Sequence, residues 1–210
     1  MVRKATGASR YDVHPGIKMV QTVITNMRAK TGRTFTEWVT LVKDSGPEQE
    51  KDRREWLKRE HGIGTNYAFM IAERAAGRGQ EDSDPEIYLK AAEGYVEAMY
   101  SGHRAKLRPI HDLLLQEARE LGDDIKICPC KTMVPVYRQH VIAQVKPAAS
   151  SRLELGLALK GARQRVTRRL QTTGGLERKD RITHKIPLGS VDQVDDEVLR
   201  WLKIAYELDA

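Results

Sequence analysis

The sequence is poor in several residue types, and each shortage excludes a class of protein. Only two of its 210 residues are cysteine, too few for a disulfide framework and compatible with a reducing compartment. No apolar run approaches the length of a membrane span, and the polar start MVRKATGASRYDVHPG lacks the apolar middle of a secretory signal. These absences predict a cytoplasmic protein with no membrane partner.

Aromatic residues and catalytic signatures are scarce as well. Phe, Trp and Tyr make up 6% of the chain, which argues against a stacking surface that reads single-stranded RNA. No nucleophile elbow, phosphate-binding loop or paired-histidine spacing is present. The sequence therefore favours a protein that is not an enzyme and needs no cofactor. An enzyme with a pocket between helices and sheet stays open as an alternative.

Three short polar motifs are candidate sites. In an extended CPC motif, Cys128 and Cys130 point to one side, but two thiolates are half the ligands of a closed zinc site, so we predict no metal. The motif RPIHD (108–112) predicts a local hydrogen-bond network rather than catalysis. Any hidden small-molecule pocket is expected near Tyr137, Arg138 and His140.

Positive charge is what the sequence has in excess, and it is unevenly placed. Lys and Arg outnumber Asp and Glu by 36 to 29, which favours polyanionic partners such as nucleic acid. Residues 152–185 hold ten cations and three acids, a surplus equal to the net charge of +7 of the whole chain. The glycines of this stretch predict an irregular basic arm, or a loose hairpin, that contacts phosphates. Its candidate residues are Lys160, Arg163, Arg165, Arg168, Arg169, Arg178, Lys179 and Arg181. A merely solvated loop is the alternative.

Hydrophobic spacing predicts an α+β fold with two domains. Four helices, at 16–30, 34–43, 47–60 and 65–76, make a helical domain of residues 14–78. Thr34 and Glu37 match a capping box, and Pro47 suits a first helical turn. The stretch GQEDSDPE (79–86) is predicted to be a linker.

The remaining residues, 87–210, predict a domain with an antiparallel sheet of about five strands and helices on one face. The expected helices are 86–100, 104–121 and 192–207. Apolar and polar residues alternate at 141–146 and 153–159, and weaker strands are expected at 125–128, 132–138 and 181–187.

The side of the sheet that no helix covers offers a different function, docking of a protein partner or of a second copy in a homodimer. The residues assigned to that face are Ile142, Gln144, Lys146, Gly156, Ala158, Lys160, Thr183 and Lys185.

The stretch LKREHGIGTNYAFMI resembles the helix-hairpin-helix motif, in which a glycine-apolar-glycine turn presents backbone N–H groups to a DNA phosphate. The resemblance covers about fifteen residues, and it departs from the motif at Glu60, where an apolar residue is usual, and at Thr65 and Asn66, where a basic residue is frequent. The phosphate-binding residues that it implies are Gly62, Ile63, Gly64, Thr65 and Asn66. A purely structural reversal of the chain is the alternative.

Two longer resemblances cover most of the chain. AKTGRTFTEWVTLVKDSG and the following residues to Ala68 resemble a small helical bacterial domain of unknown function. Residues from LRPIHDLLLQEARELG through VDDEVLRWLKIAYE resemble a second uncharacterised domain, which often follows the first and occurs in proteins described as predicted transport or restriction-related. Neither resemblance implies a catalytic residue or an activity.

Overall fold

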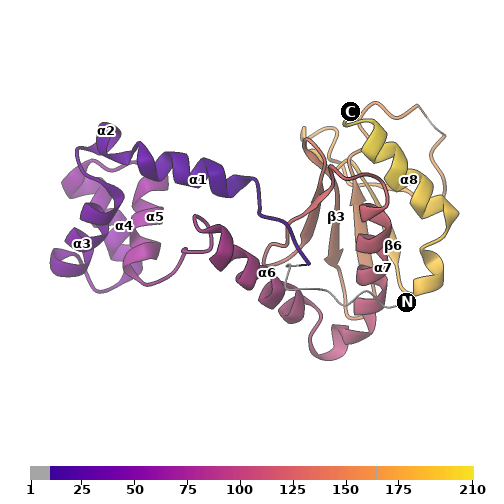
Figure 1. Cartoon of the computed structure of the whole chain (residues 1–210), viewed down its shortest axis with the longest axis horizontal. Helices are drawn as coiled ribbons and strands as arrows, with labels where there is room; N and C mark the ends of the chain where they lie inside the picture. The colour runs from indigo at the N-terminus through magenta and orange to yellow at the C-terminus, as the bar shows by residue number, and fades with distance from the viewer. Residues whose placement is uncertain (1–9, 164) are drawn as a thin grey trace. The chain divides into compact units, whose positions relative to one another are not determined.

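The computed structural model describes residues 10–163 and 165–210, which form two compact units. The helical unit comprises residues 13–90, and the sheet unit comprises residues 10–12 together with 91–210. One is all helical and the other combines helices with an antiparallel sheet, so the α+β fold predicted from the hydrophobic patterns is confirmed (Figure 1). No helix formed by these residues is long and apolar enough to cross a membrane.

Five helices of the helical unit precede residue 80. They are α1 (Gly16–Thr25), α2 (Met27–Thr31), α3 (Phe35–Ser45), α4 (Glu50–His61) and α5 (Thr65–Ala75). Their apolar side chains meet in one core, to which α3 and α5 contribute several buried residues at helical spacing. The buried members of this core are Met27, Phe35, Trp38, Val39, Val42, Leu57, Ile63, Ala68 and Ile71.

Two details of the helical unit differ from expectation. The single helix expected at 16–30 is divided at Asn26, because the Thr22 and Thr25 hydroxyls each donate to a backbone carbonyl four residues earlier at 2.9 Å, which bends a helix. Pro47 does not open the next helix but precedes it, and its carbonyl accepts a hydrogen bond from Arg53 Nε at 2.7 Å.

The expected capping box of α3 is present. Thr34 Oγ1 accepts from the Glu37 N–H at 3.2 Å, and Glu37 Oε2 accepts from the Thr34 N–H at 2.7 Å.

The helices of the sheet unit begin at polar or proline signals. Its elements are α6 (Pro85–Met99), which contributes residues to both units, the 3₁₀ helices η1 (Gly102–Leu107) and η2 (Val191–Gln193), and α7 (Arg108–Arg119) and α8 (Asp196–Glu207). The helix expected at 104–121 starts four residues later as α7, where Pro109 suits the first turn, and the residues before it are 3₁₀. Asp195 caps α8 by accepting from the Val198 N–H at 3.2 Å.

The described part of the sheet has six antiparallel strands in the order β1-β2-β3-β4-β6-β5. They are β1 (Lys126–Ile127), β2 (Val134–Tyr137), β3 (Val141–Pro147), β4 (Leu153–Leu157), β5 (Gln171–Thr172) and β6 (His184–Leu188). The strand that was not expected is β5, which lies within the predicted basic arm. It pairs with β6, so this part of the arm is a hairpin, one of the two forms predicted for it.

The alternation in β4 separates the two faces of the sheet. Leu153, Leu155 and Leu157 are buried. The helices α7 and α8 lie along one face of the sheet (Figure 1). On the other face, Glu154 pairs with Lys185 Nζ at 2.7 Å and with Lys146 Nζ at 3.9 Å. The polar face therefore neutralises much of its own charge.

Some residues expected on the open face are not available to a partner. Ile142, Ala158 and Thr183 are buried, at 0%, 7% and 0% exposure. Gly156 is covered as well, because a Cβ there would lie 2.8 Å from both Gln144 Cγ and Ile182 Cγ2.

A short N-terminal segment joins the outer edge of β1. The Asp12 N–H donates to the Ile127 carbonyl at 2.9 Å, and the Asp12 carboxylate accepts from the Ile127 N–H at 2.7 Å. Arg119 of α7 clamps the same carboxylate with an Nη2–Oδ2 distance of 2.5 Å. The sheet unit is thus built from two stretches of chain that are distant in sequence.

Candidate functional site

The first half of the basic arm is an irregular segment between β4 and β5, and it holds a group of exposed cations. These side chains fall within nine consecutive positions. They are exposed and make no side-chain hydrogen bond or ion pair with other residues that the structure describes. We call them the arm cations: Lys160, Arg163, Arg165 and Arg168. Their sequence spacing keeps like charges close together without a neutralising acid, which favours binding of an external anion.

Arg169, next in the sequence, turns back onto the protein instead. Its Nη1 lies 2.5 Å from Asp195 Oδ2 and 3.3 Å from Glu197 Oε2, and its Nη2 donates to the Gln193 carbonyl at 2.7 Å. Leu170 beside it is buried. This contact anchors the arm on the start of α8.

The cations of the second half of the arm are also less available than the sequence suggested. Arg178 Nε lies 2.9 Å from Asp180 Oδ2, and Lys179 is exposed in a turn with a φ of 60°. Arg181 pairs with Asp209 and donates from Nε to the Val141 carbonyl at 3.0 Å. The candidate residues of the arm thus divide into an unpaired group before Arg169 and a mostly paired group from it onward.

The glycine-apolar-glycine turn links α4 to α5 in the helical unit. Gly62 ends α4 in the left-handed region with a φ of 64°, and the Ile63 N–H donates back to the Leu57 carbonyl at 3.0 Å while its side chain is buried. Gly64 is the N-cap of α5 and has no side chain to accept from the first N–H groups. Thr65 and Asn66 are exposed at this end, where the helix dipole is positive.

The RPIHD motif forms the expected local network at the start of α7. Arg108 Nε donates to Asp112 Oδ1 at 2.9 Å, and His111 Nδ1 lies 3.1 Å from the same oxygen. His111 is fully buried, and burial lowers its pKa to about 4, so its ring is neutral at pH 7. Burial alone would raise the pKa of Asp112, but hydrogen bonds from Arg108 and His111 hold it below its usual range. The motif therefore fixes an ionised carboxylate on α7.

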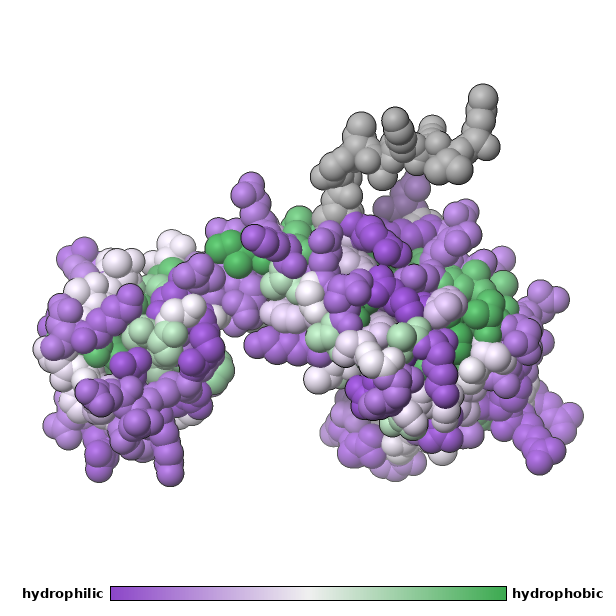
Figure 2. Space-filling model, turned by 90° about the horizontal axis from the view of Figure 1, so that it is seen from below, coloured by the Kyte–Doolittle hydropathy of each residue, from purple (hydrophilic) through white to green (hydrophobic). Residues whose placement is uncertain are grey.

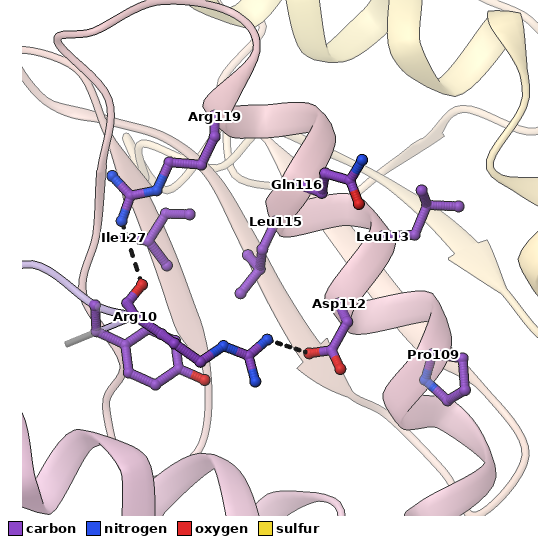
Figure 3. Close-up of a pocket in the computed structure, with 9 residues that line it drawn as sticks. Arg10, Pro109, Asp112, Leu113, Leu115, Gln116, Arg119 and Ile127 are labelled. Carbon is purple, nitrogen blue, oxygen red and sulfur yellow. Dashed lines mark hydrogen bonds and ion pairs between the residues drawn. The ribbon is translucent and has the colours of Figure 1, made fainter. Parts of the chain in front are cut away.

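A pocket of about 500 Å³ opens beside this carboxylate (Figure 3). It lies between the outer side of α7, the segment Arg10–Tyr11 and Ile127 of β1. No sequence pattern predicts this pocket, because its walls come from three separate stretches of chain.

The polar cluster expected around Tyr137, Arg138 and His140 is tied to the C-terminal end of the chain. Arg138 Nε lies 2.8 Å from Asp124 Oδ2. Asp209 accepts from the His140 N–H at 2.7 Å, lies 3.0 Å from His140 Nδ1, and also pairs with Arg181. The Asp209 side chain is only 4% exposed, so we interpret this cluster as a structural clasp around a buried carboxylate.

The two cysteines are free thiols, Cys128 buried and Cys130 partly buried. Burial raises the pKa of the Cys128 thiol to about 12, and it also raises the pKa of Cys130. Both thiols are therefore protonated at pH 7. Among the residues that the structure describes, no group of three or more His, Cys, Asp or Glu side chains is arranged to hold a metal ion.

Exposed apolar side chains are dispersed along the chain. On the face shown in Figure 2, hydrophobic residues lie in separate patches among hydrophilic ones. The large exposed apolar residues are Val13, Met19, Phe69, Ile87, Val166, Leu176, Val191 and Leu208. This distribution does not single out an apolar docking surface.

Two protein families match the chain. The family described as Domain of unknown function (DUF5655) matches residues 96–209, just over half of the chain, and the family described as Domain of unknown function (DUF4287) matches residues 19–76. They fit the two uncharacterised domains that the sequence resembles. No curated protein and no solved structure matches the chain.

Proposed function

The chain belongs to the family described as Domain of unknown function (DUF5655), and from its side chains we propose a function that this description leaves open: binding of duplex DNA through phosphates, without sequence preference and without catalysis. The observation that carries the proposal is the group of four exposed arm cations, which have no ion-pair partner among the described residues and fall between positions 160 and 168. Cations that find no acid within the protein remain available to phosphates, and binding them releases the counterions of the DNA.

The surroundings of the arm cations favour a duplex over a single strand. Binding of single strands relies on aromatic side chains that stack on bases. The irregular segment between β4 and β5 contains no aromatic residue, and Phe69 of the helical unit is the one Phe, Trp or Tyr classed as exposed in the described chain. Phosphate contacts alone position a protein on a duplex without reading its bases.

The turn between α4 and α5 supplies a second phosphate contact in the proposal. The first N–H groups of α5 have no side-chain acceptor, and the exposed Arg59 lies in the last turn of α4. A phosphate oxygen accepts readily from such N–H groups at the positive end of a helix dipole.

The test is a titration of the full-length protein with a duplex over a series of salt concentrations. Four phosphate contacts predict a slope of about −3.6 for log affinity against log salt, which is about a 150-fold loss between 50 and 200 mM. Replacing all four arm cations with alanine should remove this slope. A charge-matched control changes four exposed cations of the helical unit, Arg28, Lys30, Lys43 and Lys51, and should leave most of it. The proposal would be defeated if the affinity for DNA did not depend on the salt concentration, or if it fell equally in the arm variant and in the charge-matched control.

The contribution of the turn is measured with a proline. Thr65 is the first residue of α5, and Gly64 before it has a ψ of 151°, so Thr65→Pro removes one N–H at a position where helices accept proline. We expect about tenfold weaker DNA binding for Thr65→Pro and little change for Thr65→Ala, which keeps the N–H. Equal affinity of the two variants would restrict the interface to the arm.

A further inference from the structure

The pocket beside α7 has an apolar floor and a polar mouth. Leu115 and Ile127 are buried and line it, with Leu113 at its side (Figure 3). Arg10 reaches across to Asp112 at the mouth, and Gln116 lies one turn further along α7. Its volume of about 500 Å³ lies in the range of small-molecule sites, and polar and apolar residues share its lining.

The ion pair across the mouth is weak and can be replaced by a ligand. Arg10 Nη2 lies 3.4 Å from Asp112 Oδ1, longer than a charge-assisted hydrogen bond, and the two side chains are 63% and 37% exposed. Arg108 and His111 hold the same Asp112 oxygen at 2.9 and 3.1 Å, so the carboxylate keeps its place when Arg10 moves.

Unused hydrogen-bonding capacity remains around the mouth. Asp112 Oδ2 accepts no hydrogen bond from the described residues, and the Gln116 amide makes none either. Of the five N–H groups of the Arg10 guanidinium, only one makes a hydrogen bond with the described residues, and that bond is long. The pocket therefore offers the Asp112 carboxylate to a cationic group of a ligand and the Arg10 guanidinium to an anionic group.

We propose that this pocket binds a zwitterionic small molecule with an apolar body, such as an α-amino acid with an aromatic or branched aliphatic side chain. The ligand carboxylate takes a bidentate contact from the Arg10 guanidinium. Its ammonium group donates to Asp112 Oδ2, and its apolar body covers Leu115 and Ile127. Gln116 provides one further hydrogen bond.

The test follows backbone amide NMR signals of the full-length protein during titration with three matched probes. L-Phenylalanine carries both charges, 3-phenylpropanoate only the carboxylate, and phenethylamine only the ammonium group, while L-leucine checks the size of the apolar body. For a ligand of this size we expect saturable binding of the amino acids on the order of millimolar Kd, with shifts at Arg10, Gln116 and Ile127. Each probe with a single charge should bind about tenfold more weakly.

Two variants and a control locate the charged contacts. Arg10→Ala should weaken binding of L-phenylalanine about tenfold and leave phenethylamine unchanged, because only the carboxylate contact is lost. Gln116→Ala should weaken all charged probes to a smaller extent, and Arg200→Ala, which changes an exposed arginine outside the pocket, should have no effect. The proposal is overturned if neither amino acid gives saturable shifts, if the shifts lie elsewhere, if all three phenyl probes bind equally, or if Arg10→Ala changes nothing.

Discussion

Replacing Asp209 with asparagine is expected to lower the free energy of unfolding of the sheet unit by about 2 kcal/mol at pH 7. The buried carboxylate receives three donors, namely the His140 N–H, the His140 ring and Arg181, and a hydrogen bond to a charged group contributes about 1.5–3 kcal/mol. The asparagine oxygen still accepts from the N–H, and solvent weakens the other two contacts because Arg181 and His140 are 48% and 66% exposed. These reductions leave the value of about 2 kcal/mol.

The pH dependence of this difference gives the stricter test. Burial alone would raise the pKa of Asp209, but hydrogen bonds from His140 and the charge of Arg181 hold it below its usual range. A carboxyl whose pKa is lowered by folding stabilises above its unfolded pKa, about 3.9, and loses that contribution as the pH falls through the folded value. The difference between wild type and Asp209→Asn should therefore be full at pH 5 to 7 and shrink below about pH 4.

The assay is urea unfolding followed through the amide NMR signals of β3 and β4, which report on the sheet unit alone. Asp192→Asn is the matched control, because Asp192 is exposed in the same unit and should change stability by less than about 0.5 kcal/mol. A difference for Asp209→Asn that is absent at pH 7, or that stays constant down to pH 3, would refute the interpretation of the clasp.

Three further predictions test local features. Gly94→Ala should raise stability by about 0.5–1 kcal/mol in thermal unfolding, because Gly94 lies inside α6 and a Cβ there meets nothing within 4 Å. Gly122→Ala should lower stability by about 1–3 kcal/mol in the same assay, because its Cβ would collide with Tyr206 Oη. An unchanged unfolding midpoint would show that the Tyr206 side chain moves aside without cost. Cys128 should resist iodoacetamide at pH 7 until denaturant is added, because its thiol is buried and its pKa is raised to about 12, and rapid labelling of the folded protein would contradict this.

Features that depend on a few neighbouring residues could be predicted from the sequence. The capping box at Thr34, the alternation of β4 and the RPIHD network each involve residues within seven positions, so their geometry follows from local periodicity. The helix break at Asn26 is also local, but threonine hydroxyls that bond to the preceding turn leave the hydrophobic pattern unchanged, so that pattern predicts one unbroken helix.

Features that depend on long-range pairing could not be predicted. The surplus of positive charge in the sequence predicts one basic arm, whereas Arg169 and Arg181 pair with acids 26 and 28 positions away and so do not belong to the unpaired arm cations. The pocket has walls at Arg10, on α7 and at Ile127, and nothing in the spacing of these residues shows that they meet. The expected linker at 79–86 and the phosphate contacts remain predictions.

The attachment of Asp12 to β1 has a consequence for how the protein is made and dissected. Asp12 and Ile127 are separated by 115 positions, so at about 5–20 residues per second the first stretch is synthesised about 6–23 s before its partner. The helical unit is synthesised during that interval, because all its residues come between the two. A fragment of residues 87–210 would begin inside α6 and keep α7, α8 and all six described strands, but it would lack Asp12. The outer edge of β1 would then lose its backbone hydrogen bond and be open to pairing with other chains.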